Sequence, residues 1–258
     1  MKKITIRELT IGEGTPKICV PIIGKSKSEI LKQANTVIKC EVDMVELRAD
    51  YYEDLEQESE LYSLLESLRK VLDHTPLLFT IRTAMEGGCF QHASDTYLKI
   101  LQHVIQSNLV DMLDIELSHE AKLVTDMIHM ARLHQVITIA SHHNFTSTES
   151  MDQIRSRLLT MYSTGADVIK VAYMPNEPID VMHLMLATKE VSDSIPVPVI
   201  AISMGELGAI SRFCGEVYGS AITFAAIPGQ ESAPGQLGVD QVRVILSQIH
   251  QSHKMPNN

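Results

Sequence analysis

The feature that most constrains the fold is a repeated alternation between short apolar runs and longer segments with helical spacing, which begins at residue 17. The apolar runs are rich in Val and Ile, a composition that favours buried β-strands. Eight such runs occur, at residues 17–22, 42–48, 77–82, 110–116, 136–141, 167–172, 198–203 and 220–224. The segments that follow them predict helices over residues 26–40, 57–73, 93–107, 119–134, 149–164, 178–192, 206–213 and 239–252.

Eight strands alternating with helices in a chain of 258 residues indicate an α/β fold, the (β/α)8 TIM barrel. A doubly wound open sheet is the alternative, but no glycine-rich phosphate turn follows the first strand. Residues 3–11 alternate polar and apolar, which predicts a short N-terminal β-hairpin outside the main sheet, over one end of it. Because no linker or low-complexity segment interrupts the chain, we expect a single domain over residues 1–258.

The net charge of −10 argues against a nucleic-acid-binding protein, which would need basic stripes. It also means that any anionic ligand must be held by locally placed Arg or Lys. The four cysteines are scattered without a CxxC pair, which argues against a thiolate zinc site and does not suggest a disulfide framework. The N-terminus does not read as a signal peptide, and no apolar stretch is long enough to span a membrane. These features fit a cytoplasmic protein.

Lys170 stands inside the apolar run Asp167-Val168-Ile169-Lys170-Val171-Ala172, where a charged side chain is unusual. One interpretation is a lysine at a strand end that extends its amine to solvent along its own stem. The other is a desolvated amine with a lowered pKa, able to form an imine with a ketone or aldehyde. This stretch alone does not decide between them.

Polar residues collect where the predicted strands end, and in a TIM barrel the carboxyl ends of the strands carry the chemistry. They are Glu46, Arg48, Arg82, Glu86, Asp114, Glu116, Ser141, His142, His143, Lys170, Ser203, Ser211 and Arg212, and the loop 228–236 adds Ser232 and Gln236. Several of these residues could have a structural role in place of a catalytic or binding one. Glu46 and Arg48 could form an ion pair at the barrel mouth, and Asp114 and Glu116 could be an acid–base pair, a metal site or partners of a nearby cation. Because His142 and His143 differ in parity along the strand, at most one points inward.

Six segments in register resemble type I 3-dehydroquinate dehydratase, from the first strand to the last. They are Glu46-Leu47-Arg48, residues 82–88 (RTAMEGG), residues 141–145 (SHHNF), Ile169-Lys170-Val171-Ala172, Met204-Gly205 with Ser211-Arg212, and residues 232–236 (SAPGQ). The resemblance implies a (β/α)8 barrel that converts 3-dehydroquinate to 3-dehydroshikimate and water in the shikimate pathway of aromatic amino acid biosynthesis. It also implies no metal, no organic cofactor and a homodimer.

The resemblance, with the chemistry of dehydration next to a carbonyl, gives each residue a role. Lys170 forms the Schiff base, because an iminium stores carbanion electrons better than a ketone. His143 removes the proton and returns one to the departing hydroxyl, and Glu86 orients it. Arg212 binds the carboxylate. Hydroxyl contacts are expected from Glu46, Arg48 and Arg82. The loop 228–236, whose small residues and two prolines suit a lid that closes on ligand, is expected to add contacts from Ser232 and Gln236. Pro21 departs from the serine that some similar proteins have, so a hydroxyl contact from the first strand is in doubt.

Two other functions compete with this one. A class I Schiff-base aldolase acting on a phosphorylated sugar would need a phosphate cradle after strands seven and eight, for which Gly205-Glu206-Leu207-Gly208 is a weak candidate. A barrel that only binds an anion or a partner is the third possibility, but the presence of Lys170, His143 and Arg212 argues against it.

Overall fold

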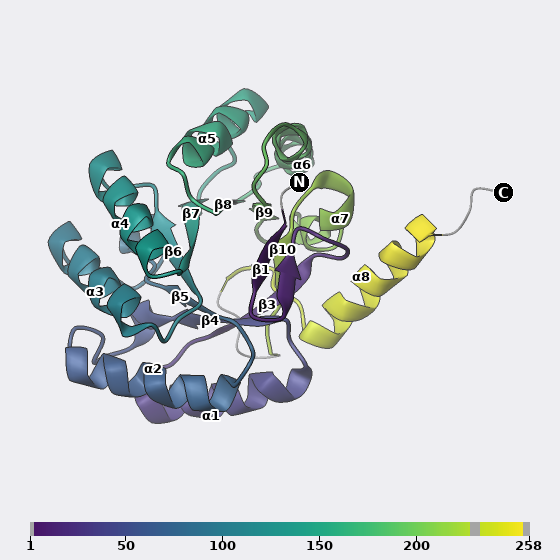
Figure 1. Cartoon of the computed structure of the whole chain (residues 1–258). Helices are drawn as coiled ribbons and strands as arrows, with labels where there is room; N and C mark the ends of the chain where they lie inside the picture. The colour runs from purple at the N-terminus through teal and green to yellow at the C-terminus, as the bar shows by residue number, and fades with distance from the viewer. Residues whose placement is uncertain (1–2, 228–232, 255–258) are drawn as a thin grey trace.

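The structure is a computed structural model, and it describes residues 3–227 and 233–254 (Figure 1). Its strands are β1 (Ile4–Ile6), β2 (Leu9–Ile11), β3 (Lys17–Ile22), β4 (Met44–Arg48), β5 (Leu77–Thr80), β6 (Met112–Glu116), β7 (Ile137–Asn144), β8 (Val168–Tyr173), β9 (Val199–Ser203) and β10 (Ile222–Phe224). Its α-helices are α1 (Lys27–Val37), α2 (Glu58–Leu72), α3 (Ser94–Ser107), α4 (Ala121–Leu133), α5 (Met151–Ser163), α6 (Pro178–Ser194), α7 (Gly215–Tyr218) and α8 (Val239–Lys254). The described residues also form the 3₁₀ helices η1 (Ile38–Cys40), η2 (Ala49–Tyr51), η3 (Ala84–Glu86) and η4 (Ala209–Arg212).

Strands β3 to β10 form the barrel, and the helices surround it (Figure 1). Eight parallel strands pair in the order β10-β3-β4-β5-β6-β7-β8-β9. The remaining seam is bridged where the Ala221 N–H donates to the Val199 carbonyl at 2.8 Å, so β9 and β10 are also neighbours. The predicted (β/α)8 fold is therefore confirmed.

The inner side chains at the amino ends of the strands form an apolar layer. This layer contains Cys19, Met44, Leu78, Met112, Ile139, Val168, Ile200 and Ile222. The β1–β2 hairpin packs Ile6 and Ile11 against it, and Arg7 in the hairpin turn pairs with Asp111 at 2.7 Å. The expected hairpin is thus present and covers the amino end of the barrel. The polar groups inside the barrel consequently face the opposite, carboxyl end.

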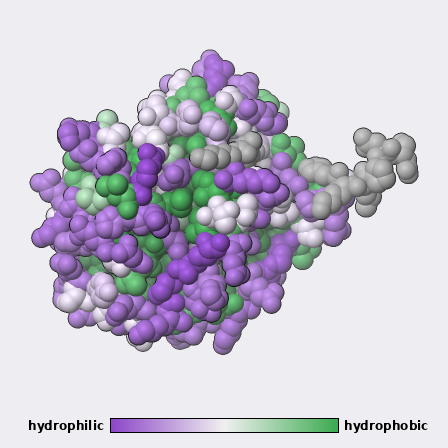
Figure 2. All heavy atoms as spheres, in the orientation of Figure 1, coloured by the Kyte–Doolittle hydropathy of each residue, from purple (hydrophilic) through white to green (hydrophobic). Residues whose placement is uncertain are grey.

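The helices follow from the spacing of their apolar residues. In α2, the five leucines on one helix face, at i, i+3, i+4, i+7 and i+11, are all buried: Leu61, Leu64, Leu65, Leu68 and Leu72. Polar residues cover the outer faces, and Figure 2 shows that most of the visible surface is hydrophilic. Among the described residues, no helix has the length and apolar character needed to cross a membrane.

Two predicted boundaries were wrong in ways that bear on the site. The fifth strand was expected over residues 136–141, but β7 continues to Asn144, because its last three residues pair with Val171, Ala172 and Tyr173 of β8. The short helix expected over residues 206–213 is instead η4 followed by α7. Gly208 permits this, since a side chain there would lie 2.3 Å from the backbone of Ser203.

Candidate active site

The barrel register brings the polar residues of six strands to one end of its interior. Side chains alternate along each strand, so Glu46 and Arg48 on β4 share the inner face. Cross-strand register places Lys170 beside Ser141, and Ala172 beside His143. A pocket opens at this end, lined by Glu46, Arg48, Arg82, His143, Phe145, Lys170, Ala172, Ile202, Met204, Arg212, Phe224, Ala233 and Gln236.

Lys170 lies at the floor of this pocket and is only 3% exposed. Its Nζ donates to Asp114 Oδ2 at 3.3 Å and lies 3.8 Å from Glu46 Oε1. The same nitrogen stands 4.6 Å from the centre of the Phe224 ring, a cation–π arrangement. The side chain therefore points into the barrel and does not extend to solvent.

Arg82 connects the carboxylates of the site. Its Nη2 lies 3.0 Å from Asp114 Oδ2, and its Nη1 lies 2.8 Å from Glu116 Oε1 and donates to Ser141 Oγ. Burial alone would raise the pKa of Asp114, but the Arg82 and Lys170 charges outweigh it and hold that pKa well below its usual range. Asp114 and Glu116 are thus partners of Arg82, and Asp114 also of Lys170, as the cation-pairing interpretation expected.

His143 faces the pocket and is held by Glu86. The Nδ1 of His143 lies 2.8 Å from Glu86 Oε2, which also accepts from the His143 backbone N–H at 3.1 Å. Burial lowers the pKa of His143 to about 3, with the Arg82 charge as the next cause. Burial would raise the pKa of Glu86, but hydrogen bonds from His142 and His143 lower it to about 2. Because an ionised carboxylate can only accept, Nδ1 carries the hydrogen and Nε2 presents a free lone pair.

His142 occupies the outer face of β7. Its ring meets Tyr173 edge-on with centroids 5.9 Å apart, and its Nδ1 lies 3.5 Å from Glu86 Oε1. Since β7 runs through both histidines, the parity argument applies. His143, and not His142, lines the pocket.

Glu46 and Arg48 do not form the ion pair that was considered as an alternative. Glu46 accepts a hydrogen bond from Thr80 at 2.9 Å. Arg48 instead makes a two-pronged pair with Asp50, with both N–O distances 2.9 Å. Both side chains are buried and line the pocket, Glu46 beside Lys170 and Arg48 nearer the mouth.

Arg212 is a buried guanidinium without a carboxylate partner among the described residues. It is 2% exposed, and its hydrogen bonds go to the backbone carbonyls of Phe224 at 3.2 Å and Pro234 at 3.0 Å. Its Nε is buried and has no hydrogen-bond partner in the part of the chain that the structure describes. Burial lowers the pKa of Arg212 to about 10, so the group stays cationic at neutral pH. An unpaired buried cation is costly, and an anionic ligand in the pocket would remove this cost.

The remaining predicted site residues have different outcomes. Gln236 lines the pocket together with Ala233, whereas Ser232 lies outside the described residues, as do residues 228–231 of the same loop. Pro21 pairs in register with Glu46 at the end of β3, so the first strand offers no side-chain hydroxyl at that position. Within the described parts of the chain, no three His, Cys, Asp or Glu side chains are grouped to hold a metal ion.

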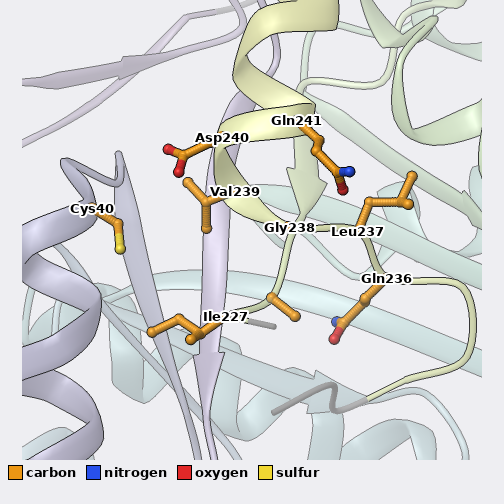
Figure 3. Close-up of a pocket in the computed structure, with 9 residues that line it drawn as sticks. Cys40, Ile227, Gln236, Leu237, Gly238, Val239, Asp240 and Gln241 are labelled. Atoms are coloured by element: carbon orange, nitrogen blue, oxygen red, sulfur yellow. The ribbon is translucent and has the colours of Figure 1, made fainter. Parts of the chain in front are cut away.

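A second hollow lies outside the barrel mouth, between Cys40 and the first turn of α8 (Figure 3). Its lining includes Ile227, Leu237 and Val239. The charged side chain in this lining is Asp240, a carboxylate. The hollow therefore lacks the cations and the neutral histidine that the barrel pocket combines.

The sequence reasoning missed three contributors to the pocket. Thr80 holds Glu46, Phe224 lies under the Lys170 amine, and Asp50 fixes Arg48. Phe224 and Thr80 lie on predicted strands, so the alternation of side chains along those strands could have predicted that they face the barrel interior. Asp50 lies beyond the strand end in η2, where alternation gives no guide.

Known proteins resemble the whole of this barrel. The sequence model of the type I 3-dehydroquinase family matches residues 18–253. The 3-dehydroquinate dehydratase of Listeria welshimeri is 39% identical over 97% of this chain and 99% of its own. The type I enzyme of Clostridium difficile, solved with covalently modified comenic acid, has a TM-score of 0.94 and 39% identity over 98% of this chain and 100% of its own. The Geobacillus kaustophilus enzyme has a TM-score of 0.94 at 33% identity, covering 98% of both chains. The chain therefore belongs to the type I 3-dehydroquinase family.

Proposed function

We propose that this protein is a hydro-lyase that dehydrates 3-dehydroquinate to 3-dehydroshikimate, in the shikimate pathway, through a Schiff base on Lys170. The observation that carries the proposal is the combination, in one pocket, of a buried lysine, a neutral histidine and a buried arginine that has no carboxylate partner among the described residues. The substrate is a cyclic ketone with a carboxylate and several hydroxyls, and each of these groups has a suitable counterpart in the lining.

The first step joins substrate and enzyme. The Lys170 amine attacks the ketone carbon, and loss of the carbonyl oxygen as water leaves an iminium. Asp114 and Glu46, whose carboxylates lie 3.3 and 3.8 Å from Nζ, stabilise the positive charge of that iminium. Arg212 pairs with the substrate carboxylate and orients the ring. Arg48 and Arg82 donate to ring hydroxyls, and Glu46 accepts from them.

The second step removes water. The free Nε2 of His143 takes a proton from the carbon next to the iminium, and the electrons move into the C–N system. The imidazolium is stabilised by the Glu86 carboxylate 2.8 Å from Nδ1. It then returns a proton to the departing hydroxyl, so that His143 is neutral again. Hydrolysis of the product iminium releases the enone and restores the lysine.

The phosphorylated-sugar aldolase has less support at the loop after β9. A phosphate cradle needs free backbone N–H groups. The Gly205 N–H already donates to the Pro234 carbonyl at 3.2 Å, and the Ala209 N–H donates to Glu206. A non-catalytic anion-binding barrel would not need the His143–Glu86 pair.

The test is direct. Purified protein with 3-dehydroquinate and a chelator should produce ultraviolet absorbance from the conjugated enone. Borohydride added during turnover should reduce the iminium and add the ligand's mass to the peptide that contains Lys170. Labelling at another lysine would contradict the mechanism, and product formation without any trapped adduct would contradict the Schiff base.

We propose in addition that the protein is a cytoplasmic homodimer. The described cysteines are all free, which suits a reducing compartment. A candidate surface for self-association is the outer face of α6, where Ile179, Met182 and Leu186 are exposed at helical spacing. Light scattering on the purified protein measures the state, and replacing Met182 with Glu should shift a dimer that uses this face towards monomer.

A further inference from the structure

Asp50 is a buried carboxylate just past the end of β4 that does not line the pocket. It lies in η2, and its side chain is 0% exposed. Its Oδ1 accepts from Arg48 Nε and its Oδ2 from Arg48 Nη2, both at 2.9 Å. Such a two-pronged pair fixes the plane of a guanidinium as well as its position.

The pair leaves one edge of the Arg48 guanidinium available. Asp50 occupies the Nε and Nη2 edge, and the ring of Tyr51 lies 5.2 Å from the guanidinium carbon. Within residues 3–227 and 233–254, Nη1 has no hydrogen bond, and Arg48 contributes to the pocket lining. Asp50 therefore determines which Arg48 donors face a bound ligand.

A second bond ties Asp50 to the loop of the next strand. Its Oδ2 also accepts from the Cys89 backbone N–H at 3.1 Å. Cys89 follows Gly88, which packs so tightly that an added Cβ would lie 2.0 Å from the Arg82 carbonyl oxygen. The same loop begins with η3, which supplies Glu86. One carboxylate thus joins the end of β4 to the segment that holds His143.

We propose that Asp50 is a positioning residue for the reaction: it holds Arg48 in the orientation that binds the hydroxyl groups of the substrate. This inference rests on the proposed function. Asp50 acts through Arg48 and does not touch the substrate itself. Loss of its pairing with Arg48, with the Cys89 hydrogen bond retained, should therefore weaken substrate binding and leave proton transfer by His143 largely intact.

Asp50→Asn tests this most sharply. The amide oxygen can still accept from the Cys89 N–H, so the Glu86 loop stays in place. The amide NH₂, however, meets an Arg48 N–H and cannot accept from it. We expect KM for 3-dehydroquinate to rise about tenfold, as for loss of one charge-assisted hydrogen bond, and kcat to stay within about threefold. Asp50→Glu, which keeps the charge, should recover most of the wild-type KM.

The double variant shows whether the effect passes through Arg48. The double variant Arg48→Ala/Asp50→Asn should have the same KM as Arg48→Ala alone. If Asp50 acts only by orienting Arg48, its substitution has no effect once Arg48 is gone, so the effects of the two substitutions on KM do not add. Asp111→Asn is the matched control. Asp111 also pairs with arginine, at 2.8 Å from Arg69, and accepts a backbone N–H, but at the opposite end of the barrel. Its loss should lower the melting temperature and leave KM unchanged.

The outcomes separate two failures. If the wild-type protein forms no enone, the proposed function fails. If it does, a wild-type KM for Asp50→Asn overturns the inference, as does an equal rise in KM with and without Arg48. An effect confined to kcat also overturns it. If circular dichroism shows that Asp50→Asn is unfolded, Asp50→Ser replaces it, because the serine hydroxyl can accept from the Cys89 N–H. KM and kcat of Asp50→Ser are then measured with and without Arg48 and judged by the same criteria.

Discussion

Replacing His143 with alanine should separate two steps that share one pocket. Imine formation needs a free amine on Lys170, whereas loss of water needs a base above the neighbouring carbon. The Lys170 amine is held by Asp114 and Glu46, neither of which contacts His143 by a hydrogen bond. The variant should therefore still capture the ketone, more slowly if His143 also moves protons during imine formation, and should fail to release product.

The size of the effect follows from the protonation state of His143. Burial and the Arg82 charge hold its pKa far below the ordinary value, at about 3, so at pH 7 nearly every molecule carries the neutral base. Removing a positioned general base costs roughly 10²–10⁴-fold in rate. That corresponds to about 2.7–5.4 kcal/mol of activation free energy. Because the same imidazole also serves as the acid, we expect kcat to fall at least to the upper end of this range.

The assay combines absorbance and mass. Enone formation measures turnover, and intact-protein mass spectrometry after incubation with substrate measures the adduct. The neighbouring variant His142→Ala is the control, since it removes an imidazole of the same strand that faces away from the pocket. It should remain active. Thermal unfolding of both variants checks that the fold stays stable when the buried Glu86 carboxylate loses an imidazole partner. A fully active His143→Ala would refute the mechanism, and the reverse pattern would exchange the roles of the two histidines.

Three further predictions concern binding, pH and packing. Arg212→Ala should raise KM roughly tenfold to hundredfold through loss of a charge-assisted pair worth about 1.5–3 kcal/mol, and a large fall in kcat at constant KM would contradict its role. Protonation of His143 removes the base, and burial lowers its pKa from the ordinary 6.5 to about 3, so kcat/KM should stay constant as the pH falls through 6.5 and decline only towards pH 3. An acid limb with a midpoint near or above 6.5 would argue against this assignment. Gly88→Ala introduces a methyl group 2.0 Å from the Arg82 carbonyl oxygen, and calorimetry should show a melting temperature lowered by about 2–12 °C, from about 1–3 kcal/mol of overpacking.

The sequence by itself determined the order of the barrel and the inner face of each strand. Apolar runs predicted all eight barrel strands, because strand formation there depends on local composition and burial. Parity then placed Lys170 and His143 on inward faces once the strands were known to extend through them. The error at residues 206–213 arose because Gly208 packs directly on the backbone of Ser203 at the end of β9, a contact that helical spacing does not encode.

The tertiary structure decided which polar groups become partners. Arg48 pairs with Asp50 and not with Glu46, and Arg212 is buried with two backbone carbonyls and no carboxylate among the described residues. It also places Glu86, which lies in η3, within hydrogen-bond distance of His143 Nδ1. These choices depend on the shear of a closed barrel and on where loops cross from one strand end to the next. Both are set by packing between segments far apart in the chain, whereas alternation along a strand is a property of the strand alone.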